Sequence, residues 1–240
     1  METLGFRFLK YFLFDWFRVR KEASEAKQHP AFNRICRLLD KEDNFQASGD
    51  AFTVFDLETT GFFPTLGDEI ISIGAIKINR TNEEVSESFY RIIRPVRKVP
   101  KTVLEITGLS ISEIKNGAPF LEVFEDFLEY CNGSTLVAHP AGFDISFLQT
   151  MAKRMGLPGF NPPYMDCEEL VKQLFPGINP QLDYLIRKFH LTELERHHAL
   201  NDAHMTGQLF VKLLEILEKG QLDEVKVIED LTQQNEEIID

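Results

Sequence analysis

The chain has 240 residues, 43% of them hydrophobic, and a formal net charge of −12. This length suffices for one domain with a full hydrophobic core and a small appendage. The acidic balance argues against a protein that holds nucleic acid by bulk charge alone. It leaves nucleic-acid chemistry open, because bound divalent cations reverse the local sign at an acidic site.

The spacing of the cysteines and the length of the apolar runs indicate the cellular compartment in which the protein is expected. Cys36, Cys131 and Cys167 lie far apart and form no C-x-x-C pair. This spacing favours free thiols over a zinc site or a disulfide framework, and therefore a reducing compartment such as the cytoplasm. No apolar run reaches the ~20 residues that a membrane-spanning helix needs.

The first 48 residues are expected to form a helical extension. Leu4 to Lys21 place basic residues on one face of a helical wheel and aromatic and aliphatic residues over much of the rest. Such a helix can pack on its own domain, lie in a membrane interface or dock on a partner such as a polymerase, and the pattern does not separate these. Residues 22–41 continue as helix with a break near His29-Pro30, and residues 43–50 read as a linker.

Residues 49–220 are expected to form one α/β domain. The first three expected strands have short connections, with a hairpin loop at 79–84, and predict an antiparallel meander. Later strands alternate with helices, so helical crossovers would bring them in parallel. The expected strands are 51–55, 69–78, 86–93, 134–138 and 164–165; the expected helices are 119–130, 144–155, 167–175, 182–189 and 199–217, with helical turns at 102–106 and 112–115. Residues 221–240 form an acidic tail, either a short helix or disordered.

A local basic cluster follows the third expected strand. Two interpretations stay open: the cluster contacts phosphate groups, or it is a solvated sheet edge protected by charge. Its members are Arg91, Arg94, Arg97, Lys98 and Lys101.

The stretch from Val54 to Gly61 carries the first chemical signal. Asp56 and Glu58 alternate at the end of a buried strand, so both side chains leave it on the same face. Two carboxylates this close repel each other unless a cation lies between them. Hard oxygen ligands suit Mg²⁺ or Mn²⁺.

A second acid follows a later strand. Asp144 comes soon after the strand ending at Ala138 and opens a helix, so it can reach over the carboxyl edge of the sheet, where open α/β sheets bind ligands. The alternative is a carboxylate that only complements the helix dipole. Asp166, after the last short strand, is a further acid without a motif.

The start of the last helix holds a histidine and an acid. His197 precedes the helix and Asp202 lies within it, so both side chains could face one cleft. A histidine near neutral pKa can take a proton from water. His198 is expected to be a structural, half-buried side chain.

Three motifs occur in order: Phe55-Asp56-Leu57-Glu58-Thr59-Thr60-Gly61, His139-x-Ala141-x-Phe143-Asp144, and His197-x-Ala199-Leu200-x-Asp202-Ala203. Together they resemble the DEDDh group of 3′-to-5′ exonucleases, the DnaQ-like group of the RNase H-like superfamily that contains the proofreading ε subunit of DNA polymerase III. Residues 106–110 and 181–185 resemble further segments of the group. The resemblance covers about residues 51 to 218.

The resemblance implies an RNase H-like fold with a mixed five-stranded sheet flanked by helices. It implies that two Mg²⁺ or Mn²⁺ ions are held by Asp56, Glu58, Asp144 and Asp202, with His197 as the general base. It also implies contacts to the terminal nucleotide from Leu57, Thr59, Thr60, Gly61, His139 and Phe143.

One residue departs from the pattern, because Pro140 stands where the group usually has Asn. Proline lacks the amide side chain and a backbone donor, which puts substrate positioning near His139 in doubt. The expected activity is release of nucleoside 5′-monophosphates from single-stranded DNA, in proofreading or repair. The alternatives are a 3′-to-5′ exoribonuclease of the same fold, and a non-catalytic module that binds nucleic-acid ends or a partner.

Overall fold

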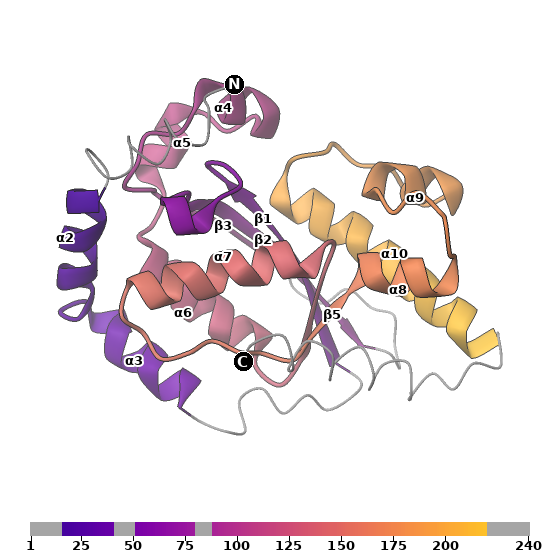
Figure 1. The fold of residues 1–240 in the computed structure, drawn as a ribbon, viewed down its shortest axis with the longest axis horizontal. Helices are drawn as coiled ribbons and strands as arrows, with labels where there is room; N and C mark the ends of the chain where they lie inside the picture. The colour runs from indigo at the N-terminus through magenta and orange to yellow at the C-terminus, as the bar shows by residue number, and fades with distance from the viewer. Residues whose placement is uncertain (1–15, 41–50, 80–87, 220–240) are drawn as a thin grey trace.

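The computed structural model describes residues 16–40, 51–79 and 88–219, which fold around one sheet (Figure 1). The strand order within these residues is β3-β2-β1-β4-β5. β1 pairs antiparallel with β2, and β2 with β3, whereas β4 runs parallel to β1 and β5 to β4. The mixed sheet and the antiparallel meander are therefore confirmed. The strands are β1 (Ala51–Thr59), β2 (Ile70–Asn79), β3 (Phe89–Ile92), β4 (Thr135–Ala138) and β5 (Tyr164–Asp166).

Helices cover both faces of the sheet because side chains alternate along the buried strands. Phe55 and Leu57 of β1 belong to the hydrophobic core shared with α3, α6 and α7, and Phe52 and Val54 to the core shared with α8, α9 and α10. The helices of the domain are α4 (Lys101–Thr107), α5 (Ile111–Asn116), α6 (Phe120–Cys131), α7 (Ala141–Arg154), α8 (Cys167–Leu174), α9 (Leu182–Lys188) and α10 (Ala199–Lys219).

The described part of the N-terminal extension packs on the domain. α2 (Trp16–Ala26) and α3 (Pro30–Leu39) are separated at the predicted break, with His29 capping α3. Ile35 of α3 is fully buried in the core shared with α6, and the Arg34 guanidinium pairs with the Glu125 carboxylate. Residues 1–15, the larger part of the predicted amphipathic helix, lie outside the described residues.

Several boundaries differ from the prediction. β1 continues to Thr59, so both of its acids are strand residues. α7 begins at Ala141, three residues before the expected start, because Pro140 provides its N-cap position in extended conformation. The predicted linker and acidic tail lie outside the described residues. The predicted hairpin loop does so beyond Asn79, which is the last residue of β2. The three cysteines are free thiols, as predicted. Among the residues described, no helix has the length and apolar character needed to cross a bilayer.

Candidate active site

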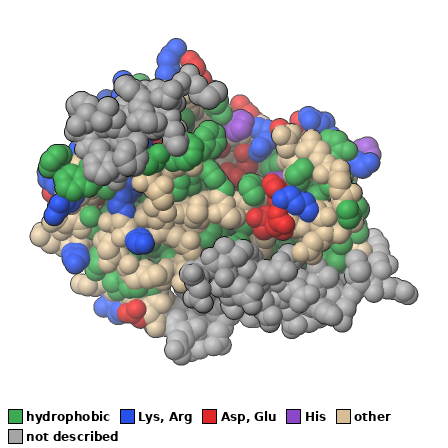
Figure 2. All heavy atoms as spheres, in the orientation of Figure 1, with side chains coloured by type: hydrophobic (Ala, Val, Ile, Leu, Met, Phe, Trp, Pro, Cys, Tyr) green, Lys and Arg blue, Asp and Glu red, His purple; other side chains and the backbone are tan. Residues whose placement is uncertain are grey.

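A cleft of about 320 Å³ opens at the carboxyl ends of β1 and β4. Figure 2 shows acidic side chains gathered in a hollow just above the centre of the view, with a histidine beside them. The cleft is lined by Asp56, Leu57, Glu58, Phe62, His139, Pro140, Phe143, Asp144, Leu182, Arg196, His197 and Asp202. The four acids and the histidine of the three motifs therefore line one cavity, although they are up to 146 positions apart in the chain.

β1 supplies two of the acids. Asp56 and Glu58 alternate around Leu57 and share the face covered by α10. Burial, followed by the charges of Asp144 and Asp202, raises the pKa of Asp56 well above its usual value. Burial and the charge of Asp202 raise the pKa of Glu58 to about 8. Such shifts indicate carboxylates crowded without enough positive charge.

The first turn of α7 supplies the third acid. Asp144 is 3% exposed, so its carboxylate is almost out of contact with water. Burial raises its pKa, the charges of Asp166 and Glu58 add to the rise, and the backbone of Leu57, between the two acids of β1, opposes it. Asp144 therefore faces the cleft as well as standing near the positive end of a helix dipole.

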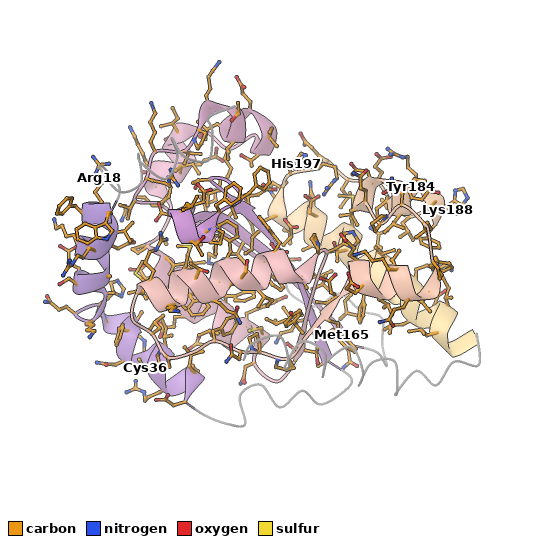
Figure 3. All side chains as sticks on the ribbon, in the orientation of Figure 1. Arg18, Cys36, Met165, Tyr184, Lys188 and His197 are labelled. Atoms are coloured by element: carbon orange, nitrogen blue, oxygen red, sulfur yellow. The ribbon has the colours of Figure 1, made fainter. Side chains whose placement is uncertain are left out.

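The entry to α10 supplies the histidine and the fourth acid. The backbone N–H of His197 donates to Oδ2 of Asp202 at 3.0 Å. His197 has a φ of +62°, a left-handed conformation that is unfavourable for non-glycine residues and often marks functional sites. A ring nitrogen of His197 and carboxylate oxygens of Glu58 and Asp202 all lie within 4.8 Å of one another. Figure 3 shows His197 where the chain enters α10.

The neighbouring histidine anchors this helix start to the sheet. The ring of His198 stacks on Tyr90 of β3, with 4.6 Å between centroids and 23° between planes. Gly74 of β2, which pairs with Tyr90 in the sheet, lies against the backbone of Ala199 and Leu200. The structural role predicted for His198 agrees with this geometry, because its ring packs on the sheet.

Arg196 also lines the cleft. Its Nη1 lies 2.6 Å from Oδ1 of Asp202, and its Nε lies 2.5 Å from Oδ1 of Asp183 in the first turn of α9. Burial raises the pKa of Asp202, while the Arg196 charge opposes that rise. Sequence reasoning missed Arg196, although a cation directly before the histidine of the third motif was a visible signal.

The middle motif places His139 beside α9. Its Nε2 lies 2.7 Å from the carbonyl oxygen of Pro180, and burial lowers the pKa of the ring. The His139-Pro140 peptide bond is cis. Asp166, the acid without a motif, accepts from the backbone N–H groups of Gly142 and Glu168 and caps α8. Its contacts are therefore those of a structural residue.

Only some of the residues predicted to contact the substrate line the cleft. Leu57, His139 and Phe143 line the cleft, whereas Thr59, Thr60 and Gly61 are not among its lining residues. Thr60 is 1% exposed. Its hydroxyl donates to Asp68 at 3.3 Å and accepts from the backbone N–H of Glu69 at 3.0 Å. Thr59 donates to the carbonyl oxygen of Gly61.

Two hydrophobic lining residues were not predicted. Phe62 is 74% exposed and its ring lies 6.3 Å from that of Phe143. It directly follows Gly61 of the first motif, and this position was the available signal. Leu182 belongs to the segment 181–185 that resembles the family, but no role was assigned to it.

The basic cluster is largely taken up by ion pairs within the domain. Arg97 pairs with the buried Asp68 at 2.6 Å, Arg91 lies 3.5 Å from Asp126, and Lys101 lies 3.0 Å from Glu105. These contacts favour the structural interpretation of the cluster over the phosphate-binding one.

The donor set fits hard divalent cations. Four carboxylates line one cleft, and three of them have pKa values raised by the charges of others in the set. A cation between them would relieve this repulsion, and oxygen-only ligands are those that Mg²⁺ and Mn²⁺ prefer.

The sheet topology and the order of the three motifs agree with the fold that the resemblance to DEDDh exonucleases predicts. The chain belongs to the exonuclease family, whose model matches residues 53–210. Its curated relatives include the DNA polymerase III PolC-type of Caldanaerobacter subterraneus, 36% identical over 186 residues, and that of Thermotoga petrophila, 34% identical over 198 residues. These matches cover 77% and 82% of this chain but only 13% and 14% of the relatives, so the chain spans about one seventh of their length.

Solved structures share the fold at low sequence identity. The nuclease domain of 3′hExo, a DEDDh family member bound to rAMP, has a TM-score of 0.63 at 17% identity, covering 72% of this chain and 94% of that one. Exonuclease X in complex with 5′ overhanging duplex DNA has a TM-score of 0.57 at 21% identity, covering 77% and 99%. E. coli Exonuclease I in complex with a dT13 oligonucleotide has a TM-score of 0.61 at 15% identity, covering 71% and 42%.

Proposed function

We propose that this protein is a 3′-to-5′ exonuclease that hydrolyses the terminal phosphodiester of single-stranded DNA and releases nucleoside 5′-monophosphates. The observation that carries the proposal is the convergence of Asp56, Glu58, Asp144, Asp202 and His197 on one cleft. The name of the relatives, DNA polymerase III PolC-type, supports DNA as the substrate and a polymerase as the setting. The role that we propose in that setting is proofreading or repair.

In this proposal the four carboxylates hold two Mg²⁺ or Mn²⁺ ions. When bound, such ions would polarise the phosphate of the substrate and stabilise the negative charge that develops in the reaction. Asp144 of α7 lies close enough to the acids of β1 for their charges to raise one another's pKa. The hydrogen bond from the His197 backbone N–H to Asp202 holds the histidine and the fourth acid together at the entry to α10.

His197 is the proposed general base. It is exposed to solvent, and a ring nitrogen lies within 4.8 Å of the carboxylate oxygens of Glu58 and Asp202. A neutral imidazole in this position takes the proton of the attacking water. His198 cannot exchange roles with it in this structure, because its ring is stacked on Tyr90.

The substrate end enters beside Phe62 and Phe143. An exposed aromatic ring next to an acidic cleft offers a face on which a terminal base can stack, which does not depend on base identity. Leu57 and His139 line the same cleft. Thr59, Thr60 and Gly61 stay predicted substrate contacts outside the lining of the cleft, and the Thr60 backbone N–H donates to the Glu69 carbonyl oxygen. Thr60 has no free side chain to offer, because its hydroxyl serves Asp68 and Glu69.

Residues 49–220 form the exonuclease domain in this proposal, with 1–48 as a helical extension and 221–240 as an acidic tail. An exoribonuclease is the alternative, since the 3′hExo domain of the same fold was solved with rAMP. Substrate choice depends on contacts to the 2′-hydroxyl group.

The test is digestion of 5′-labelled DNA and RNA strands of the same sequence in Mg²⁺, with chromatography of the products. We expect stepwise shortening of the DNA from its 3′ end, nucleoside 5′-monophosphates as products, and slower digestion of RNA. A strand blocked by a 3′-terminal phosphorothioate linkage is the substrate control. Faster digestion of RNA than of DNA would show that the protein is an exoribonuclease. If no nucleotides are released in Mg²⁺ or Mn²⁺, the remaining alternative is a non-catalytic module that binds nucleic-acid ends or a partner.

A further inference from the structure

The Arg196 side chain joins two helices at the edge of the cleft. Its Nη1 lies 2.6 Å from Oδ1 of Asp202 on α10, and its Nε lies 2.5 Å from Oδ1 of Asp183 on α9. The Arg196 side chain is 30% exposed, the Asp202 side chain 4% and the Asp183 side chain 48%. One end of this bridge is therefore buried in the site, and the other end is open to water.

The two oxygens of Asp202 differ in their contacts. Oδ1 forms an ion pair with Arg196, 2.6 Å from Nη1, without a hydrogen bond, whereas Oδ2 accepts a hydrogen bond from the backbone N–H of His197 at 3.0 Å. The His197 bond is made by the backbone at the start of α10 and is fixed by the chain path. The Arg196 contact is made by a long side chain with rotatable bonds, so it is the contact that can be exchanged.

Arg196 is also the lone Lys or Arg among the described residues that line the cleft. Its positive charge opposes the pKa rises of Asp56, Glu58 and Asp202. In a site of crowded carboxylates it supplies part of the positive charge that a bound cation would supply.

We propose that Arg196 is the internal counter-cation of the metal-free site, which holds Asp202 until a divalent ion displaces the guanidinium. The inference rests on the proposed function, because it takes Asp202 as a ligand. Asp183 gives the displaced guanidinium a partner at the solvent-exposed end of the bridge. Arg196 thereby sets the concentration of divalent ion at which the cleft fills.

The experiment measures Mn²⁺ binding to the full chain without nucleic acid, from the electron paramagnetic resonance signal of free Mn²⁺. Arg196→Gln removes the charge and keeps a polar side chain. We expect this variant to bind Mn²⁺ about 3- to 10-fold more tightly than the wild type, since a partly exposed ion pair has modest strength. Arg196→Lys keeps the charge and should stay closer to the wild type.

Arg187→Gln is the matched control. Arg187 lies on α9, pairs with Glu193 at 3.8 Å and is 63% exposed, outside the residues that line the cleft. Its Mn²⁺ affinity should equal that of the wild type. A second measurement follows thermal unfolding. The metal-free Arg196→Gln variant should have a lower Tm, and Mn²⁺ should raise it by more than in the wild type.

Equal or weaker Mn²⁺ binding by a folded Arg196→Gln variant would overturn the inference and leave the proposed function standing. No Mn²⁺ or Mg²⁺ binding by the wild type would overturn the metal dependence of the proposed function as well. Arg196→Met, of similar length and without charge, should show the same tighter binding and serves if the Gln variant does not fold.

Discussion

Gly74 of β2 lies directly opposite Asp56 of β1, and the absence of its side chain lets α10 begin against the sheet at that point. A Cβ added at Gly74 would lie 2.2 Å from the backbone nitrogen of Leu200 and 2.3 Å from the backbone carbon of Ala199. The two backbones cannot yield as a flexible side chain would. The site therefore depends on a residue that carries no chemistry itself.

Gly74→Ala should push the start of α10 away from β2. We expect a loss of about 1–3 kcal/mol in the free energy of unfolding, typical of overpacking, together with a lower kcat because His197 and Asp202 move with the helix. Chemical denaturation and single-strand digestion measure the two effects. Gly142→Ala is the control for stability, because nothing lies within 4 Å of its added Cβ. An unchanged Gly74→Ala protein would refute the close packing.

Asp56→Asn should abolish hydrolysis and leave the fold intact. Removing one charge from a crowded set of acids relieves repulsion, so the metal-free variant should be at least as stable as the wild type. Product release in Mg²⁺ and thermal unfolding without metal are the measurements. Glu193→Gln, an exposed acid away from the cleft, is the control for both. Wild-type turnover by Asp56→Asn would contradict the assignment of Asp56 as an ion ligand.

His197→Ala should lower kcat by about 10²–10⁴-fold, the usual size of the loss of a general base. His198→Ala is the matched comparison. It should lower kcat less, through a loosened helix start, and His198→Phe should recover most of the activity because a phenyl ring can stack on Tyr90. A larger loss of kcat in His198→Ala than in His197→Ala would show that His197 is not the general base.

Glu22 of α2 should make the stability of the protein depend on pH. Burial, followed by the charge of Glu69, raises its pKa from 4.5 to about 7. The folded state therefore binds more protons than the unfolded state between pH 4.5 and 7, and this contribution to stability is lost as pH rises across that window. Glu22→Gln should raise the Tm at pH 8 and have little effect at pH 4.

The control for that prediction is Glu25→Gln on the same helix, since Glu25 is 66% exposed in its contact with Lys21. Thermal unfolding of the two variants at pH 4 and pH 8 gives the comparison. Equal behaviour of the two variants at pH 8 would show that α2 does not bury Glu22 against the domain in solution.

The alternation of Asp56 and Glu58 could be read from the sequence because it depends only on the geometry of a strand. The direction of the Thr60 side chain could not be predicted from the sequence. The register of β1 against β2 shifts between Glu58 and Thr59, and such an irregularity breaks the alternation that sequence reasoning assumes. The Thr60 hydroxyl consequently binds Asp68 and Glu69 instead of lining the cleft.

Contacts between charged residues far apart in the chain could not be predicted from the sequence either. A run of basic residues after β3 has the same pattern whether it meets phosphate or carboxylate, and only the fold brings Arg97 to the buried Asp68. The bridge from Arg196 to Asp183 and Asp202 likewise needs α9 and α10 to lie side by side. Motif order predicted the acids and the histidine that line the cleft, whereas their counter-charges depended on tertiary structure.

The packing of α3 has a practical consequence for anyone who shortens this chain. The family match starts at residue 53, yet Ile35 is fully buried against the same core as α6, and Arg34 neutralises Glu125 there. A protein trimmed to the family boundaries would expose that apolar surface and leave Glu125, which is 7% exposed in the intact protein, without its cation. We therefore expect a stable fragment to include α3, which belongs to none of the three motifs.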